Sequence, residues 1–120
     1  MPNEAEAITI RFADDFEANL YALAKRYRSI RNDVQPVIEQ IQAGNFIGDR
    51  LTGMGEDYII LKVRVKNSNI QKGKSAGYRM IYQVESPSIV LLLTIYSKSD
   101  RTDISLNEIR SIIAEFDENE

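Results

Sequence analysis

The chain has 120 residues, of which 43% are hydrophobic and 28% charged, and its formal net charge is −3. These values are typical of one globular domain, so we expect a single domain over residues 1–120. The absence of cysteine and histidine excludes disulfides, thiolate nucleophiles, cysteine metal sites and the commonest general base. Any catalysis must use Lys, Arg, Tyr, Asp, Glu, Ser or Thr.

The N-terminal residues are acidic and contain no cationic segment followed by an apolar one, so no signal peptide is expected. The longest apolar run, IVLLLTIY at residues 89–96, is too short to span a bilayer and is typical of a buried strand. We therefore expect a cytoplasmic protein that has no membrane partner.

The first half of the chain predicts a strand followed by two helices. Residues 8–12 alternate apolar and polar side chains as a strand does, and residues 13–27 carry an apolar stripe with helical spacing. A second helix is expected before Gly44, which is a plausible C-terminal stop. Because proline is tolerated in the first turn of a helix, Pro36 predicts a start near Asn32 or Asp33, with a longer kinked helix as the alternative.

In the second half the periodicity changes to two. Residues 59–65 have apolar side chains at the odd positions, whereas Lys62, Arg64 and Lys66 occupy even positions, so one face of this strand packs on a core and the other presents positive charge. Residues 77–84 and 88–96 predict two further strands, joined by a turn, and a capping-box pattern at residues 105–108 predicts the start of a last helix. The expected order is β-α-α-β-β-β-α, an α+β fold.

The positive charge is concentrated in one part of the sequence. Residues 58–82 contain six cations and no acid, whereas residues 1–20 contain one Arg against five acids and residues 100–120 two Arg against seven acids. Such a local basic patch in an acidic chain favours a defined polyanion site, and the alternative is a set of solvated cations on a strand face. Tyr78 and Tyr82 share the opposite strand face from Arg79, and we expect these two tyrosines in the core and not as base-stacking platforms.

Two segments carry a family resemblance. KGKSAGYRMIY at residues 72–82 and IYSKSDRTDIS at residues 95–105 resemble the RelE/HigB toxins of the RelE/ParE superfamily. The segments KRYRSIRND and VRVKNS are similar to a cyanobacterial-like branch of that group. The resemblance implies a microbial ribonuclease-like fold, in which a twisted, mostly antiparallel sheet has two N-terminal helices packed on one face and a C-terminal helix.

The resemblance also implies a function. Such a protein is the toxin of a type II toxin–antitoxin system, cuts mRNA in the ribosomal A site, and is inhibited by a cognate antitoxin that wraps it and can displace its C-terminal helix. The cleavage needs no cofactor and no metal, because the RNA 2′-hydroxyl is the nucleophile; it leaves a 2′,3′-cyclic phosphate and a 5′-hydroxyl.

Site residues are carried over from the matching motifs. Arg79 matches the strand arginine of the family, and because a guanidinium donates two hydrogen bonds to phosphate and stays charged, it suits stabilisation of the phosphorane. The remaining catalytic candidates are Lys62, Arg64 and Lys98. The substrate-binding candidates are Lys66, Lys72, Lys74, Tyr96 and Arg101. Ile104 stands where some members have a tyrosine as acid or base, so Tyr96 or a lysine would have to substitute.

Three other functions remain open. The chain could be a non-nuclease toxin of the same fold that inhibits gyrase, as ParE does, or a catalytically weak module that binds RNA or an antitoxin. A Mg²⁺-dependent nuclease using Asp100 and Asp103 is the third, but their position before a helix favours helix capping and N-terminal charge.

Overall fold

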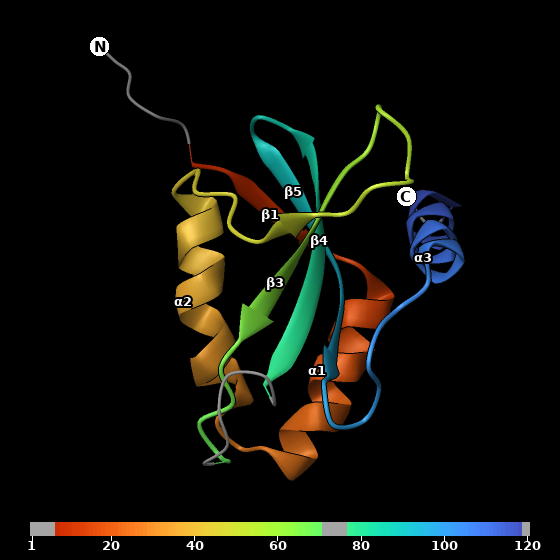
Figure 1. The fold of residues 1–120 in the computed structure, drawn as a ribbon. Helices are drawn as coiled ribbons and strands as arrows, with labels where there is room; N and C mark the ends of the chain where they lie inside the picture. Colours follow the sequence, from red (N-terminus) through yellow and green to blue (C-terminus); the bar gives the residue numbers. More distant parts are fainter. Residues whose placement is uncertain (1–6, 71–76, 119–120) are drawn as a thin grey trace.

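The structure, a computed structural model, describes residues 7–70 and 77–118. Its sheet has five strands in the spatial order β1-β5-β4-β3-β2. The strands are β1 (Thr9–Phe12), β2 (Asp49–Arg50), β3 (Ile59–Val65), β4 (Tyr78–Ser86) and β5 (Ile89–Ser97). β1 runs parallel to β5 and the other neighbours are antiparallel, so the sheet is mostly antiparallel, as predicted (Figure 1).

Three helices in the described part of the chain cover the sheet: α1 (Asp14–Arg26), α2 (Ile30–Gln42) and α3 (Leu106–Glu118). α1 and α2 bury Phe16, Leu23, Ile30 and Ile41 against one sheet face, and α3 belongs to a second core cluster, on the opposite face. The predicted element order is confirmed, with the two-residue strand β2 as an unpredicted addition.

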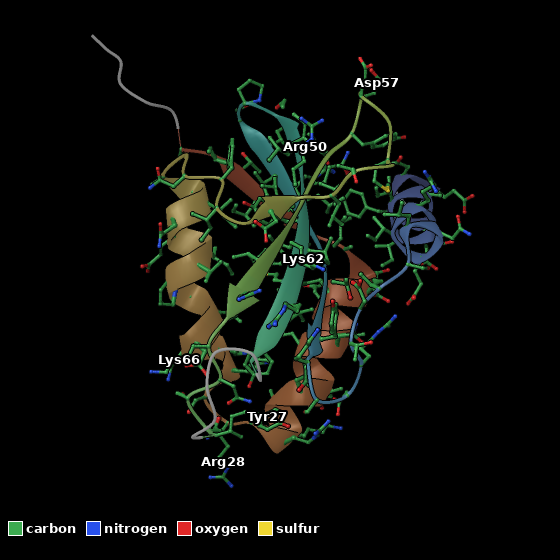
Figure 2. The ribbon with its side chains drawn as sticks, viewed as in Figure 1. Tyr27, Arg28, Arg50, Asp57, Lys62 and Lys66 are labelled. Atoms are coloured by element: carbon green, nitrogen blue, oxygen red, sulfur yellow. The ribbon has the colours of Figure 1, made fainter. Side chains whose placement is uncertain are left out.

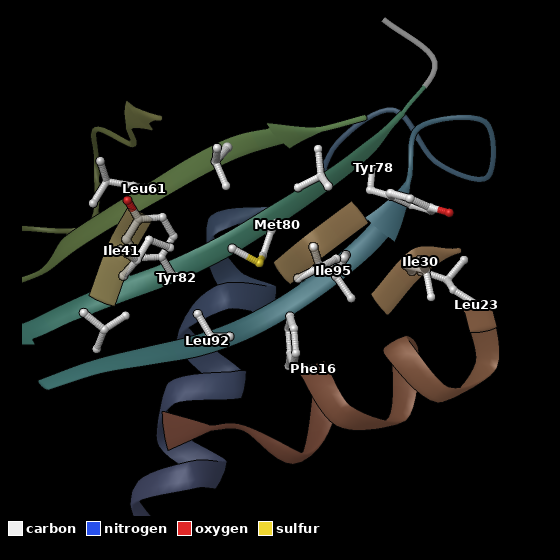
Figure 3. Packing of buried hydrophobic residues seen from close by; sticks show 14 of the residues in the cluster. Phe16, Leu23, Ile30, Ile41, Leu61, Tyr78, Met80, Tyr82, Leu92 and Ile95 are labelled. Atoms are coloured by element: carbon white, nitrogen blue, oxygen red, sulfur yellow. The ribbon is translucent and has the colours of Figure 1, made fainter. Parts of the chain in front are cut away.

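The first core confirms the alternation predicted for β3 from Leu61 onwards, whereas Ile59, predicted on the same core face, is exposed at the start of the strand. Leu61, Val63 and Val65 of β3 are buried in it, and between them Lys62 is partly exposed and Arg64 exposed. Tyr78 and Tyr82 of β4 are 0% exposed and lie in the same core (Figure 3). The two tyrosines are therefore core residues, as expected.

The start of α2 differs from the prediction near Asn32 or Asp33. The helix begins at Ile30 and contains Pro36 in its interior. Ile30 is 0% exposed, so its burial favours an extra N-terminal turn that offsets the hydrogen bond lost at the proline. The predicted stop is confirmed, because Gly44 follows the helix with φ +94°, a conformation that favours glycine.

At the start of β4 the two central strands approach closely. A Cβ atom at Gly77 would lie 2.2 Å from the carbonyl oxygen of Val65, so only glycine fits this position without a shift of the backbone. The motif glycine that precedes Tyr78 and Arg79 therefore has a packing role. Within residues 7–70 and 77–118, none of the helices has the length and apolar character needed to cross a membrane.

Candidate nucleic-acid interface

Three strands bring Arg64, Arg79 and Tyr96 into one line across the sheet, which we name the Arg64–Tyr96 row. In the strand register Arg64 of β3 lies opposite Arg79 of β4, and Arg79 lies opposite Tyr96 of β5. Residues directly opposite on neighbouring strands share a face. On the same face, Ile60, Ile81 and Leu93 belong to the second core, which α3 covers. The part of this face under α3 is therefore apolar, and the part that carries the row is polar.

A β-bulge places Tyr96 in this row. Leu91 and Leu93 of β5 belong to the second core cluster, and so does Tyr96, although its number is even. The register shifts between Ile81 and Tyr82, where one extra residue on β5 reverses the alternation of side chains. Tyr96 therefore lies on the same face as Arg79 instead of under the N-terminal helices.

The two cations of the row, Arg64 and Arg79, form no ion pair with an acid among residues 7–70 and 77–118. Arg79 is 6% exposed, and its Nη1 donates to the carbonyl oxygen of Tyr78 at 3.2 Å. Arg64 is exposed. Since like charges that face each other across two strands repel, and a buried cation without a partner is costly, this pair suits an incoming anion.

Lys62 contacts an acid that comes from the segment after β5. Its Nζ lies 3.3 Å from Oδ1 of Asp103, and the same oxygen accepts the backbone N–H of Ile104 at 2.8 Å. The backbone hydrogen bond is the main cause that lowers the pKa of Asp103, with Lys62 and Lys98 adding to it. Asp103 is therefore an ionised carboxylate beside the row at neutral pH.

Arg101 covers the ring of Tyr96, with its guanidinium carbon 5.4 Å from the ring centroid. Its Nη1 and Nη2 donate to Glu108 at 3.1 and 2.7 Å, and its Nε donates to the carbonyl oxygen of Asp103 at 3.0 Å. The Glu108 carboxylate raises the pKa of Arg101, and that hydrogen bond lowers the pKa of Glu108. The guanidinium is therefore held in a fixed plane.

Tyr96 is 6% exposed, and its hydroxyl has no hydrogen-bond partner among the described residues. Burial is the main cause that raises the pKa of Tyr96; Asp103 adds to it, whereas Arg79 and Arg101 act in the opposite direction. Tyr96 therefore keeps its proton at neutral pH, so it can donate a hydrogen bond or a proton but cannot act as a base.

Of the remaining predicted residues, Lys66 and Lys98 lie outside the Arg64–Tyr96 row. Figure 2 shows Lys62 over the middle of the sheet and Lys66 at the far end of β3, with Lys66 exposed. Lys98 follows β5, and its Nζ donates to the carbonyl oxygen of Thr102 at 2.8 Å. Lys72 and Lys74 lie outside the described residues.

The roles expected for Asp100 and Asp103 in helix capping were wrong. Ser105 caps α3, its Oγ accepting the N–H of Glu108 at 3.1 Å, and the Glu108 side chain pairs with Arg101 instead of closing the capping box. Asp100 lies 2.6 Å from Arg26 of α1. No group of three acidic side chains that could hold a metal ion occurs in the part of the chain that the structure describes.

Comparison with known proteins agrees with this fold. No family model matches the sequence, and no curated protein matches it. Among solved structures, the chain is similar to a mutant of the E. coli toxin RelE in its free state, with a TM-score of 0.54 and 17% sequence identity over 92% of this chain and 97% of that chain. At this identity the likeness establishes a RelE-like fold, which confirms the predicted fold class.

Proposed function

We propose that this protein is the toxin of a type II toxin–antitoxin system and acts in the cytoplasm as a ribosome-dependent mRNA endoribonuclease of the RelE/HigB type, in the cyanobacterial-like branch. Its partners are then a cognate antitoxin and mRNA in the ribosomal A site. The proposal is supported by the RelE-like fold together with one feature of the site, the facing pair of Arg64 and Arg79, to which no carboxylate of the described residues is paired.

A phosphate is the natural partner of that pair. Arg79 donates to the developing negative charge of the phosphorane, while Arg64 and Lys62 hold the neighbouring phosphate oxygens. Because Arg79 is largely buried, its interaction with an anion is screened less by solvent than that of a surface arginine. Lys66 and Lys98 hold the RNA backbone farther from the cut, and Lys72 and Lys74 are kept as substrate-binding residues on the motif alone.

The proton transfers are assigned to the two groups nearest the row. Among the described residues, both hydrogen bonds of the Asp103 side chain use Oδ1, which leaves Oδ2 to accept the proton of the 2′-hydroxyl. Tyr96, which stays protonated because its pKa is raised, donates to the leaving 5′-oxygen. A carboxylate with a lowered pKa is a weak base, so we expect slow cleavage that depends on the positioning of the RNA by the ribosome.

Primer extension on mRNA from translating ribosomes tests this function, with the wild type compared with Arg79→Met. We expect new 5′ ends at A-site codons with the wild type and their loss in the variant. Arg28→Met is the matched control, since Arg28 is exposed and lies outside the site; it should cut like the wild type. Ribosomes that give no new 5′ ends with the wild type would contradict the proposal.

A second candidate, an RNA-binding module that does not cut, is favoured by one observation. Ile104 is buried in the second core, so the place where some relatives have a tyrosine holds an apolar side chain. Unchanged RNA length together with binding that weakens as salt rises would identify such a module, because phosphate contacts release counterions. Inhibition of gyrase supercoiling at saturating protein would instead favour the ParE-like alternative.

A further inference from the structure

A polar pocket lies where the Arg64–Tyr96 row reaches β5. Its volume is about 260 Å³, and its walls include Asn19, Ala22 and Arg26 of α1 together with Tyr96 and Arg101. Tyr96 belongs both to the row and to the pocket wall, so the two features are continuous. If a phosphate of an RNA strand binds at the row, the nucleoside attached to that phosphate lies next to this pocket.

The charges of the pocket are neutralised internally. Arg26 lies 2.6 Å from Asp100, and Arg101 forms two hydrogen bonds to Glu108. The pocket thus differs from the row, where neither Arg64 nor Arg79 is paired with an acid of the described residues. A neutral, polar group fits it better than a second phosphate does, and its size is below that of a typical site for a whole small-molecule ligand.

The guanidinium of Arg101 is suited to stack a flat ring. One side of it covers Tyr96 at 5.4 Å, and three hydrogen bonds, to Glu108 and to the Asp103 carbonyl, fix its plane. Its side chain is still 40% exposed. Nucleobases stack on arginine planes of this kind when single-stranded RNA is bound.

One polar atom on the wall is available to the edge of a ring, and a second is buried without a partner among the described residues. The Nδ2 group of Asn19 donates both hydrogen bonds of this side chain among the described residues, one to Asp15 and one to Thr94. The Oδ1 atom of Asn19 is therefore available as an acceptor. The hydroxyl of Tyr96 is a buried donor with no partner among the described residues. An exocyclic amino group of a base satisfies Oδ1, whereas the carbonyl of uracil at the same position does not.

We infer that this pocket binds one unpaired nucleobase next to the scissile phosphate, stacked on Arg101, and that Asn19 favours adenine or cytosine over uracil there. The inference rests on the proposed ribonuclease function and adds a determinant of base preference to it. Arg101 is then a base-stacking residue, whereas the motif alone had assigned it only to substrate binding.

Nucleosides test the pocket without using the row, because they carry no phosphate. Adenosine, cytidine and uridine are titrated into the ¹⁵N-labelled full chain while the side-chain amide of Asn19 is followed by NMR. We expect saturable shifts with adenosine or cytidine and smaller ones with uridine. Ala22→Leu, which fills the pocket from α1, should abolish them, and Ala18→Leu, an exposed position on the same helix, should not.

Mapping of cleavage sites gives the second readout. Since a stacked base contributes enough to change affinity by about fivefold or more, we expect Ala22→Leu to weaken RNA binding by at least about that factor and to remove the base preference that Asn19 gives, with Ala18→Leu unchanged. Shifts of Asn19 that persist in Ala22→Leu, or no saturable shift with any nucleoside, would overturn the pocket. Cleavage whose base preference survives Ala22→Leu would overturn it and leave the ribonuclease intact. Nucleoside binding without RNA cleavage would support the pocket and remove the ribonuclease.

Discussion

Replacement of Arg79 by methionine separates the contribution of this residue to function from its contribution to stability. The arginine is 6% exposed, faces Arg64 across the strands, and has no acidic partner in the described part of the chain. Methionine keeps most of the apolar stem and removes the charge. The variant should therefore fold as well as the wild type, or better, while it cleaves RNA much more slowly.

The expected change in the stability of Arg79→Met is the sum of two favourable contributions and one unfavourable contribution. Removal of a like charge on the opposite strand stabilises by about 0.2–1 kcal/mol, and the penalty for a buried cation, which can reach several kcal/mol, is also lost. Against these stands the charge-assisted hydrogen bond to the Tyr78 carbonyl, which contributes about 1.5–3 kcal/mol. We expect a net gain near 1 kcal/mol, or a rise in Tm of about 4 °C. Loss of one donor to the transition state should slow cleavage by about 10²–10³.

Urea unfolding and thermal denaturation measure the first quantity, and single-turnover cleavage on programmed ribosomes measures the second. Arg28→Met is the control for removal of one exposed positive charge, and its stability should stay within about 0.5 kcal/mol of wild type. If Arg79→Met lost more than about 1 kcal/mol of stability and still cleaved at the wild-type rate, Arg79 would be a structural residue, and the reasoning from its unpaired charge would be refuted.

Three further changes test other parts of the structure. Tyr82→Phe removes a buried hydrogen bond from the phenol to a backbone carbonyl 2.5 Å away and should cost about 1 kcal/mol in urea unfolding. Burial raises the pKa of Tyr82 to about 12. The stability that its hydroxyl contributes is therefore complete below pH about 10 and is lost as the pH rises through that raised value. If Tyr82→Phe lost stability at alkaline pH in the same way as the wild type, this prediction would be contradicted. Gly77→Ala should destabilise by about 1–3 kcal/mol, because its Cβ would lie 2.2 Å from the Val65 carbonyl oxygen, and a variant of wild-type Tm would show that the strands separate easily. Asp103→Asn releases Lys62 from its ion pair and removes the proposed base. RNA binding, measured by fluorescence anisotropy, should therefore tighten, with a salt slope steeper by about one, while single-turnover cleavage slows by about 10²–10⁴. Equal losses of binding and of cleavage would argue for a structural role of Asp103.

Local patterns in the sequence predicted much of the fold. Alternation along β3 placed its valines in the core and Arg64 outside, and the same period assigned Tyr78 and Tyr82 to the opposite face from Arg79. These predictions succeed because the periods of strands and helices are properties of neighbouring residues. The bounds of α2 were less predictable, since the burial of Ile30 against the sheet outweighs the local preference of Pro36.

The sequence by itself therefore determined the kind and order of the main elements, the core face of β3 from Leu61 onwards and of β4, and the concentration of cations around these two strands. Only the tertiary structure decided which side chains meet. The β-bulge that brings Tyr96 into line with Arg79 changes the face on which the end of β5 presents its side chains, and the apolar run IVLLLTIY gives no sign of it. The ion pair between Lys62 and Asp103 joins residues 41 positions apart. Both depend on strand register and on the path of the segment after β5, and these follow from long-range packing that no local period encodes.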